Sequence, residues 1–398
     1  MQRPIYLDNH STTAVDPRVA EAMWPYFTQE YGNAGSVTHA YGGRAREALE
    51  AARGRLAAAL GARPGELVFT SGATESNNLA LRGIPPRRGG SSRHLVSVAT
   101  EHHGVLDPLE RLRRAGHEVT LLSVHPQGHP ACGQVDLEQL EQALRPETDV
   151  VSVMLANNEI GVIQPLARIA EVCRRREVLL HCDATQAVGK MPVDVRELGV
   201  DLLSFSAHKL YGPKGIGVLY VRERSPRIRL TPQIDGGGQE RGLRSGTVPV
   251  PLVVGLATAL DLCLAELPGE AVRLGLLRDR LLARLQSRLP ELRVNGPELE
   301  SPDRPNPGRL PHNLNVCFPA VEGETLMLQT PEVAVSSGSA CSASSPEPSH
   351  VLRGIGIPDE AIRRSLRFGL GRFTTEADVD AAADALAASV ERLRGMLG

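Results

Sequence analysis

Short runs of apolar and β-branched residues alternate, through the first 260 residues, with longer stretches in which apolar side chains recur every three or four positions. The first pattern is typical of buried strands and the second of helices. We expect strands at Leu67–Thr70, His94–Thr100, Glu118–Val124, Val150–Leu155, Val178–His181, Leu202–Ser206 and Ile216–Val221. We expect helices at Arg44–Leu60, Leu137–Leu144 and Leu166–Arg176. This alternation predicts an α/β fold with a mostly parallel seven-stranded sheet that helices cover on both faces.

The last two expected strands differ from the others in how they are joined. Only a short Gly/Pro-containing loop separates Leu202–Ser206 from Ile216–Val221. A parallel pair needs a crossover of a dozen or more residues, so one of these two strands should run antiparallel.

The remainder of the chain has a different pattern. A helical stretch runs from about Pro251 to Leu289, with Pro268-Gly269 expected as a break, and a connector rich in Pro, Gly and Asn follows at Asn295–Pro311. Beyond it we expect a strand at Asn313–Phe318, a helix near Glu322–Leu328 and a closing helix at Glu376–Leu397. A chain of 398 residues exceeds one ordinary core. We therefore predict a large domain of residues 16–260 and a smaller α+β domain of residues 1–15 plus 261–398.

Composition narrows the class of protein. The net charge of −2 lacks the basic excess expected of a nucleic-acid-binding protein. No uninterrupted apolar run reaches the eighteen or so residues of a membrane span, and the first residues contain no signal-peptide pattern. Six cysteines lie far apart and form no Cys-x-x-Cys pair, so we expect free, mostly buried thiols and no metal site. These features favour a cytoplasmic protein that binds neither nucleic acid nor membrane.

Lysine is rare in this chain. Of 44 basic residues, only Lys190, Lys209 and Lys214 are lysines. A lysine that persists where arginine is otherwise used is a candidate for chemistry that needs an amine, above all Schiff-base formation. For any one of the three taken alone, a surface lysine is the simpler interpretation.

Polar residues follow four of the expected strands. His102, Asn158, Asp183 and Lys209 each come shortly after a strand end, and the carboxyl ends of parallel strands are where open α/β sheets bind ligands. Between Thr70 and Glu75, which include Ala73 and Thr74, the sequence predicts a strand, a small-residue turn and a helix start that could cradle a phosphate. Each residue singly has an ordinary structural explanation, but that explanation is improbable for all of them together.

These residue types suit pyridoxal 5′-phosphate. Lys209 can bind the cofactor as a Schiff base, and Asp183 can pair with the pyridine nitrogen so that the ring withdraws electrons. His102 can lie on the ring face, and Gln186 can donate to the phenolic oxygen. Ser206 and His208, which flank the lysine, can reach the phosphate.

The chain also resembles a known family over nearly its whole length. The resemblance is to class V, fold-type-I cysteine desulfurases, in particular the NifS/IscS-like first group. It rests on Asp8–Thr13, Thr70–Ser76, Thr100–His102, Asn157–Gly161, His181–Gln186, Ser204–Gly215, Arg244–Thr247, Ser336–Cys341 and Leu366–Arg372. It implies fold type I of the pyridoxal-phosphate enzymes and the conversion of L-cysteine to L-alanine, with the sulfur left as a persulfide on Cys341.

The resemblance also implies roles for individual residues. Arg367 would hold the substrate carboxylate with Asn33 nearby, and Asn158 would lie near the phenolic oxygen beside Gln186. Thr74 would contact the phosphate. Thr247 would reach the phosphate of a neighbouring subunit, which implies a homodimer. His102 would also move a proton to the substrate thiol.

Cys341 differs from the other cysteines in its setting. It lies in Ser336–Pro348, a small and polar segment with almost nothing to bury, which we expect to be a mobile loop that carries sulfur to an acceptor. The resemblance implies an acceptor protein such as an iron–sulfur scaffold; transfer-RNA or cofactor thiolation is the alternative destination. The sequence ends shortly after its last expected helix, so we expect no extended scaffold-docking tail. Cys182, beside Asp183, stands where relatives have an aliphatic residue, and we expect it to be a core side chain.

Two other kinds of protein fit part of the pattern. Another class V enzyme, such as an aminotransferase or a selenocysteine lyase, would need the same lysine, but transamination needs no cysteine on a mobile loop. A non-catalytic sulfur carrier of the same fold would need no Lys209.

Overall fold

Seven strands form the central sheet in the order β2-β8-β7-β6-β5-β3-β4. The computed structural model of the protein describes residues 3–86, 92–299, 308–337 and 348–397. The strands are β2 (Leu67–Thr70), β3 (His94–Val98), β4 (Glu118–Leu122), β5 (Thr148–Ser152), β6 (Leu179–Asp183), β7 (Leu202–Ser206) and β8 (Gly217–Val221). Each overlaps one predicted strand. β8 runs antiparallel to both β7 and β2, which confirms the exception predicted from the short loop.

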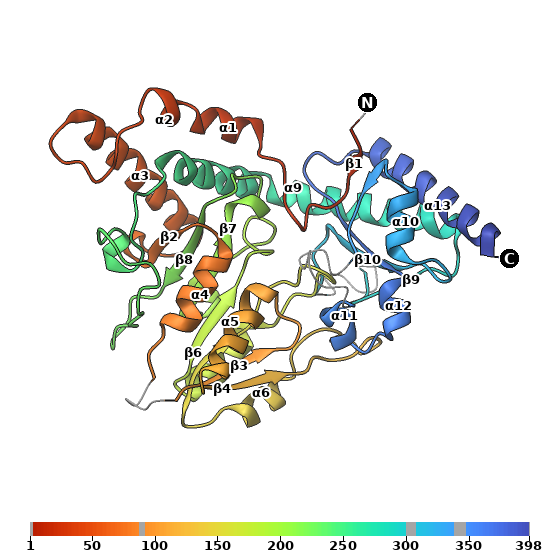
Figure 1. Cartoon of the computed structure of the whole chain (residues 1–398), viewed down its shortest axis with the longest axis horizontal. Coiled ribbons are helices and arrows are strands. Elements are labelled where there is room, and N and C mark those ends of the chain that lie inside the picture. Colours follow the sequence, from red (N-terminus) through yellow and green to blue (C-terminus); the bar gives the residue numbers. More distant parts are fainter. Residues whose placement is uncertain (1–2, 87–91, 300–307, 338–347, 398) are drawn as a thin grey trace.

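Helices cover both faces of this sheet, as the alternating pattern predicts (Figure 1). They are α1 (Pro17–Met23), α2 (Pro25–Thr28), α3 (Ala40–Ala59), α4 (Ala73–Gly83), α5 (His103–Arg114), α6 (Leu137–Ala143), α7 (Leu166–Arg175) and α8 (Val195–Leu198). Helix α3 begins four residues before its predicted start because His39 caps it, its Nδ1 accepting from the Gly42 amide at 3.2 Å.

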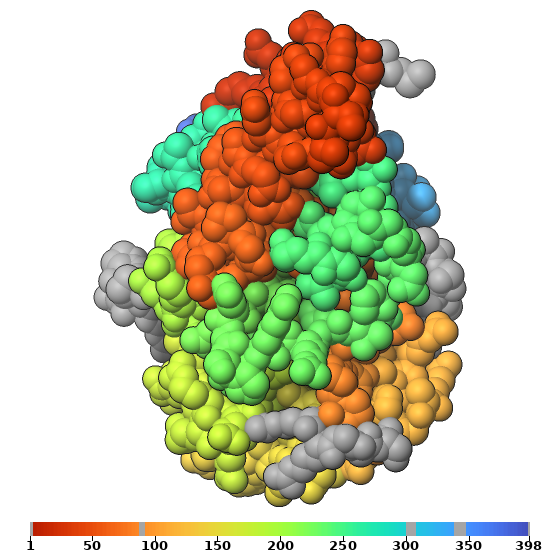
Figure 2. All heavy atoms as spheres, turned by 90° about the vertical axis from the view of Figure 1, so that its left-hand side faces the viewer, coloured from red at the N-terminus to blue at the C-terminus, as the bar shows by residue number. Residues whose placement is uncertain are grey.

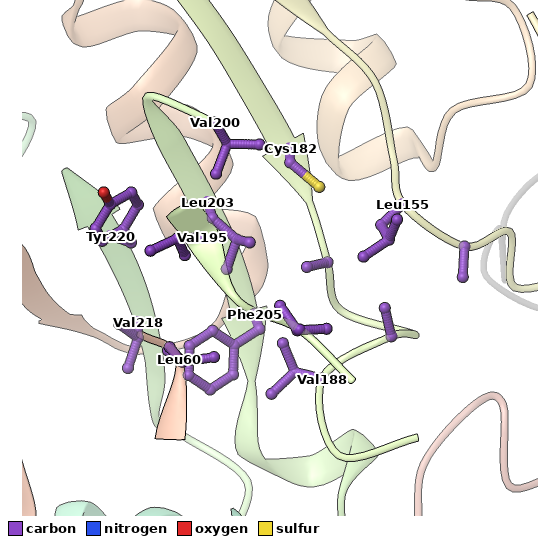
Figure 3. Packing of buried hydrophobic residues seen from close by; sticks show 14 of the residues in the cluster. Leu60, Leu155, Cys182, Val188, Val195, Val200, Leu203, Phe205, Val218 and Tyr220 are labelled. Carbon is purple, nitrogen blue, oxygen red and sulfur yellow. The ribbon is translucent and has the colours of Figure 1, made fainter. Parts of the chain in front are cut away.

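The alternation of side chains along each strand separates the two faces. Cys182, Leu203, Phe205 and Tyr220 pack together on one face, in a cluster that also takes in α3, α7 and the first half of α9 (Figure 3). The other face packs against α4 and α5. Cys182 is fully buried, which confirms its predicted core position. Its neighbour Asp183 therefore points to the opposite face.

Helix α9 (Val250–Arg288) connects the two parts of the molecule (Figure 1). The predicted break at Pro268-Gly269 is wrong, because the helix continues through both residues. Pro268 is exposed, and buried apolar residues before and after it hold the helix in place. Among the described helices, α9 is long and apolar enough to cross a membrane by length and composition. Half of its apolar window is buried in protein, as in a core helix.

A second hydrophobic cluster contains Leu7 and residues between 274 and 390. It surrounds a three-stranded antiparallel sheet of β12 (Ser365–Gly369), β10 (Asn313–Cys317) and β9 (Arg293–Val294), beside the parallel pair β1 (Ile5–Tyr6) and β11 (Val333–Ala334). The helices are α10 (Gly323–Gln329), α11 (His350–Gly354), α12 (Asp359–Arg363) and α13 (Glu376–Leu397). The predicted strand, short helix and closing helix are confirmed. The domain boundaries at residues 15 and 260 stay predictions.

The segment after β1 joins the second cluster to the central sheet. The Asn9 amide donates to the Gly369 carbonyl at 3.0 Å, and the Thr13 amide donates to the His208 carbonyl at 2.9 Å. Residues 8–13 therefore run from the small sheet to the carboxyl end of β7.

Candidate active site

A cavity of about 570 Å³ opens at the carboxyl ends of β3, β5, β6 and β7. Nine residues that the sequence singles out line it: Ala73, Thr74, His102, Asn158, Asp183, Gln186, Ser206, His208 and Lys209. The structure therefore gathers at one place side chains that are more than 130 positions apart in the sequence. A sheet whose parallel strands end at one edge accounts for this.

Lys209 lies at the end of a 3-10 turn, η2 (Ala207–Lys209), directly after β7. Its Nζ donates to the carbonyls of His10 and Ser11, both at 2.7 Å. Burial, together with Lys209 and Lys214, lowers the pKa of the neighbouring His208 to about 4, so His208 is neutral at physiological pH. Two backbone carbonyls therefore hold the amine at the cavity wall.

Asp183 ends β6 with its carboxylate held from two sides. Oδ2 accepts from Asn77 Nδ2 at 2.7 Å, and Oδ1 accepts from the Thr185 amide at 3.0 Å. Two residues earlier on β6 lies His181, whose ring forms hydrogen bonds with the Ser152 and Ser204 hydroxyls. Burial lowers the pKa of His181 to about 4. A carboxylate fixed in this way can receive a cationic N–H from the cavity.

His102 caps α5, and this role fixes its ring. Its Nδ1 accepts from the Gly104 amide at 2.9 Å, and burial lowers its pKa below the ordinary value. The ring is therefore neutral with its proton on Nε2. A Cβ at position 104 would lie only 3.1 Å from His102 Nδ1, so glycine there leaves room for the cap.

The beginning of α4 borders the cavity without a side-chain cap. Its N-cap residue is Gly72, and the hydroxyls of Thr70 and Ser76, 2.8 Å apart, brace the turn. The first amides of a helix carry a partial positive charge and are a natural anion site. Ser206 and Lys214 also line the cavity.

Arg367 does not line the cavity but contacts residues that do. Its side chain is fully buried. Nη2 donates to Ser11 Oγ and Ser336 Oγ at 2.8 Å and to Asp8 Oδ1 at 3.0 Å, and Nη1 donates to the Asn158 carbonyl at 3.2 Å. Nε is buried without a hydrogen-bond partner among the described residues.

Two predicted residues lie away from this cavity. Asn33 and Thr247 are both exposed, and Asn33 lines a separate cavity of about 350 Å³ together with Gln239 and Arg241. Figure 2 faces the side of the molecule where the segment after β8 (green) lies beside the N-terminal helices (red to orange). The roles of Asn33 toward substrate and of Thr247 toward a neighbouring subunit stay predictions.

Cys341 lies outside the described residues, so its role also stays a prediction. The other five cysteines are all buried and free: Cys132, Cys173, Cys182, Cys263 and Cys317. Burial raises the pKa of each of these thiols. A thiol with a raised pKa is a poor nucleophile, so none of the five is a candidate for sulfur transfer.

Four polar residues of the cavity wall had no predicted role: Ser11, Thr12, Asn77 and Thr185. Lys214, which was named only as one of the three lysines, lines the cavity as well. The scarcity of lysine was a usable signal for Lys214. Ser11 and Thr12 could not be placed from local pattern, because a segment of the chain that begins in the small sheet brings them to the cavity.

Comparisons with known proteins place the chain in a family. The model of the aminotransferase class-V family matches residues 5–382, and the chain belongs to this family. It is 52% identical over 396 residues to a protein named cysteine desulfurase IscS from Anaeromyxobacter dehalogenans, covering 100% of this chain and 95% of that one. It is 50% identical to a mitochondrial cysteine desulfurase of Drosophila melanogaster, covering 99% of this chain and 82% of that one.

A solved structure is similar as well. A NifS-like protein superimposes with a TM-score of 0.87 at 34% identity, over 98% of this chain and 100% of that one. The fold predicted from the sequence, fold type I of the pyridoxal-phosphate enzymes with a mostly parallel seven-stranded sheet, is confirmed.

Proposed function

We propose that this protein is a pyridoxal-phosphate-dependent cysteine desulfurase that converts L-cysteine to L-alanine and leaves the sulfur as a persulfide on Cys341. The observation that carries the proposal is the single cavity lined by Lys209, Asp183, His102 and the start of α4. The names of relatives about 50% identical over the whole chain support it.

The residues present fit the cofactor chemically. Asp183 offers a fixed carboxylate for a pyridine N–H, and the uncapped start of α4 with Lys214 offers donors for a phosphate. Asn77 Oδ1 is a buried polar atom beside this cavity without a partner among the described residues. The cofactor, when bound, supplies an electron sink for the substrate's Cα.

Binding the cofactor and transferring protons are assigned to side chains of this protein. Lys209 Nζ would hold the cofactor covalently, and its amine would take the proton from the substrate's Cα. His102 presents its Nε2 proton to the cavity and is placed to pass it to a departing group. Ser206 and His208 would also contact the phosphate, and Gln186 would donate to the phenolic oxygen.

Arg367 is the proposed carboxylate-binding residue. Its guanidinium pairs with the Asp8 carboxylate, and this contact supports a role in binding a carboxylate in the buried setting. Substrate binding would exchange one of its contacts to Asp8, Ser11 or Ser336 for the substrate carboxylate.

Sulfur transfer is assigned to Cys341. Its thiolate attacks the substrate Sγ, the carbon–sulfur bond breaks with its electron pair remaining on the substrate carbon, and protonation there gives alanine. The raised pKa values of the five described cysteines leave no competing thiol among them. The persulfide sulfur then passes to an acceptor protein, such as an iron–sulfur scaffold.

We further propose a homodimer in the cytoplasm. The exposure of Thr247 leaves it available to a neighbouring subunit. Five free cysteines without a disulfide are typical of a reducing compartment.

The cofactor assignment is tested by reduction with borohydride followed by peptide mapping. The yellow holoenzyme should lose its visible band, and the cofactor should stay attached to the peptide that contains Lys209. Lys190 and Lys214 are internal controls, and attachment to either of them would overturn the assignment. Lys209→Arg keeps the positive charge and should retain no covalent cofactor.

A further inference from the structure

A buried chain of hydrogen bonds leads from the small sheet to the cavity wall. It runs from Arg309 through Asn313 of β10 and His10 to Gln186. All four side chains are at most 6% exposed. Asn, Gln and His side chains can each donate or accept. The direction of each hydrogen bond must therefore be fixed by a group that can only donate or only accept.

Arg309 sets the sense at one end, because a guanidinium only donates. Its Nε and Nη2 donate to Asn313 Oδ1 at 3.2 and 2.9 Å. Its Nη1 donates to the carbonyls of Asn295 and Pro297, which holds the group in place. Asn313 must therefore present its NH₂ on the other side. There it donates to the Glu159 carbonyl at 3.1 Å, an acceptor that confirms this orientation.

The same NH₂ lies 3.0 Å from His10 Nε2, which must accept. The proton of a neutral His10 is then on Nδ1, and Nδ1 donates to Gln186 Oε1 at 3.1 Å. Burial lowers the pKa of His10 well below its ordinary value, and the charges of Arg367, Lys209 and Lys190 lower it further. Burial also lowers the pKa of the facing His312, whose ring stacks on that of His10 at 4.7 Å.

At the cavity, this chain of hydrogen bonds fixes the orientation of the Gln186 side-chain amide. Its Oε1 is occupied by His10 Nδ1, and its Nε2 donates one proton to the His10 carbonyl at 3.0 Å. That carbonyl also accepts from Lys209 Nζ at 2.7 Å. One N–H of Gln186 remains, on a residue that lines the cavity.

We propose that His10 and Asn313 are positioning residues that fix Gln186 with its amide nitrogen toward the cavity, so that it can only donate to the phenolic oxygen of the cofactor. The orientation of Gln186 concerns the protein alone, and its donation to the phenolic oxygen rests on the proposed function. A histidine on the segment that also holds Lys209 thus orients two groups at once.

The orientation is tested first without cofactor. Nitrogen-15 NMR of the histidine-labelled apoprotein, with His10 assigned through His10→Asn, should find the His10 proton on Nδ1 and Nε2 unprotonated. Asn313→Asp presents an acceptor to Nε2 and should place a proton there. Asn315→Asp, also buried on β10 but not bonded to His10, is the matched control and should leave His10 unchanged. A wild-type His10 protonated on Nε2 would overturn the proposal.

The consequence is tested in the holoenzyme by titrating the visible band with pH. A donor to the phenolic oxygen stabilises its anion, so losing the donor should raise the midpoint. Gln186→Leu should raise it by about half a pH unit or more, and His10→Phe, which keeps an aromatic ring, should raise it in the same direction. His10→Asn restores a donor near the place of Nδ1 and should return the midpoint toward wild type.

An unchanged midpoint in His10→Phe, with a clear shift in Gln186→Leu, would contradict the role of His10. A wild-type protein that gains no visible band with pyridoxal phosphate would instead contradict the proposed function. The two failures are distinguishable, because the apoprotein measurement needs no cofactor.

Discussion

Replacing Glu159 with glutamine should make the protein more stable at neutral pH and leave its stability at acid pH nearly unchanged. Glu159 is buried, and its Oε2 accepts from Ser349 Oγ at 2.5 Å. Burial raises the pKa of this carboxyl to about 7, although the Ser349 hydrogen bond and the charge of Arg367 act in the opposite direction. The neutral acid is therefore favoured in the folded protein.

The magnitude follows from the difference between the folded and unfolded pKa values. Below about pH 4.5 the carboxyl is protonated in both states and contributes no difference. As the pH rises toward 7 the unfolded state loses this proton while the folded state keeps it, so the free energy of unfolding falls. A pKa raised from 4.5 to about 7 corresponds to roughly 3 kcal/mol, reached in full above pH 7. Glutamine cannot ionise and is spared this loss.

The assay is urea unfolding of the cofactor-free protein from about pH 5 to about pH 8, comparing wild type with Glu159→Gln. The variant should gain stability relative to wild type progressively over this interval. Glu171→Gln, which alters an exposed carboxylate of α7, controls for the substitution itself. A constant difference between Glu159→Gln and wild type at all pH values would contradict a raised pKa for Glu159 in the folded protein.

Three further predictions concern assembly and packing. Diluting the holoenzyme should weaken cofactor retention and activity together, because Thr247 is proposed to serve the neighbouring subunit; a fully active monomer in sedimentation would contradict this. Thr247→Ala should show the same loss at higher protein concentration. Arg53→Met should lower the free energy of unfolding by roughly 3–5 kcal/mol in urea titrations, because it leaves the Glu240 carboxylate, now 2.7 Å from Arg53 Nη2, buried without its partner. A loss below about 1 kcal/mol would show that this pair behaves as a surface ion pair.

Regular patterning made the large sheet predictable. Each of its strands is a short apolar run bounded by turn residues, so both the number of strands and the antiparallel one could be predicted. The strand that carries Arg367 was not predicted as a strand, because a buried arginine interrupts its apolar pattern. The continuity of α9 through Pro268 was also unpredictable, since packing on both sides of the proline, and not local preference, maintains the helix.

The site residues at strand ends could be predicted from the sequence. Those that distant segments of the chain bring to the cavity could not. Asp183 ends a strand, and Lys209 and His102 each come shortly after one, so the sheet itself brings them together. His10 was quoted only as part of a motif, because its contacts to Gln186 and Asn313 span 176 and 303 positions. No local pattern encodes such contacts. Lys209 was distinguished by composition, since an amine is conspicuous in a chain that otherwise uses arginine.

The desulfurase assignment is tested by comparing Cys341→Ser with wild type in the presence of L-cysteine. The variant lacks the nucleophilic thiolate but keeps Lys209, Arg367 and the cavity, so it should bind pyridoxal phosphate normally and its spectrum should still change on addition of cysteine. Alanine production should stop, because no group can take the sulfur. In wild type, brief incubation with cysteine should add one sulfur atom, removable by dithiothreitol, to the peptide that contains Cys341. Alanine formed by Cys341→Ser at the wild-type rate would contradict the desulfurase mechanism and favour an aminotransferase or a lyase.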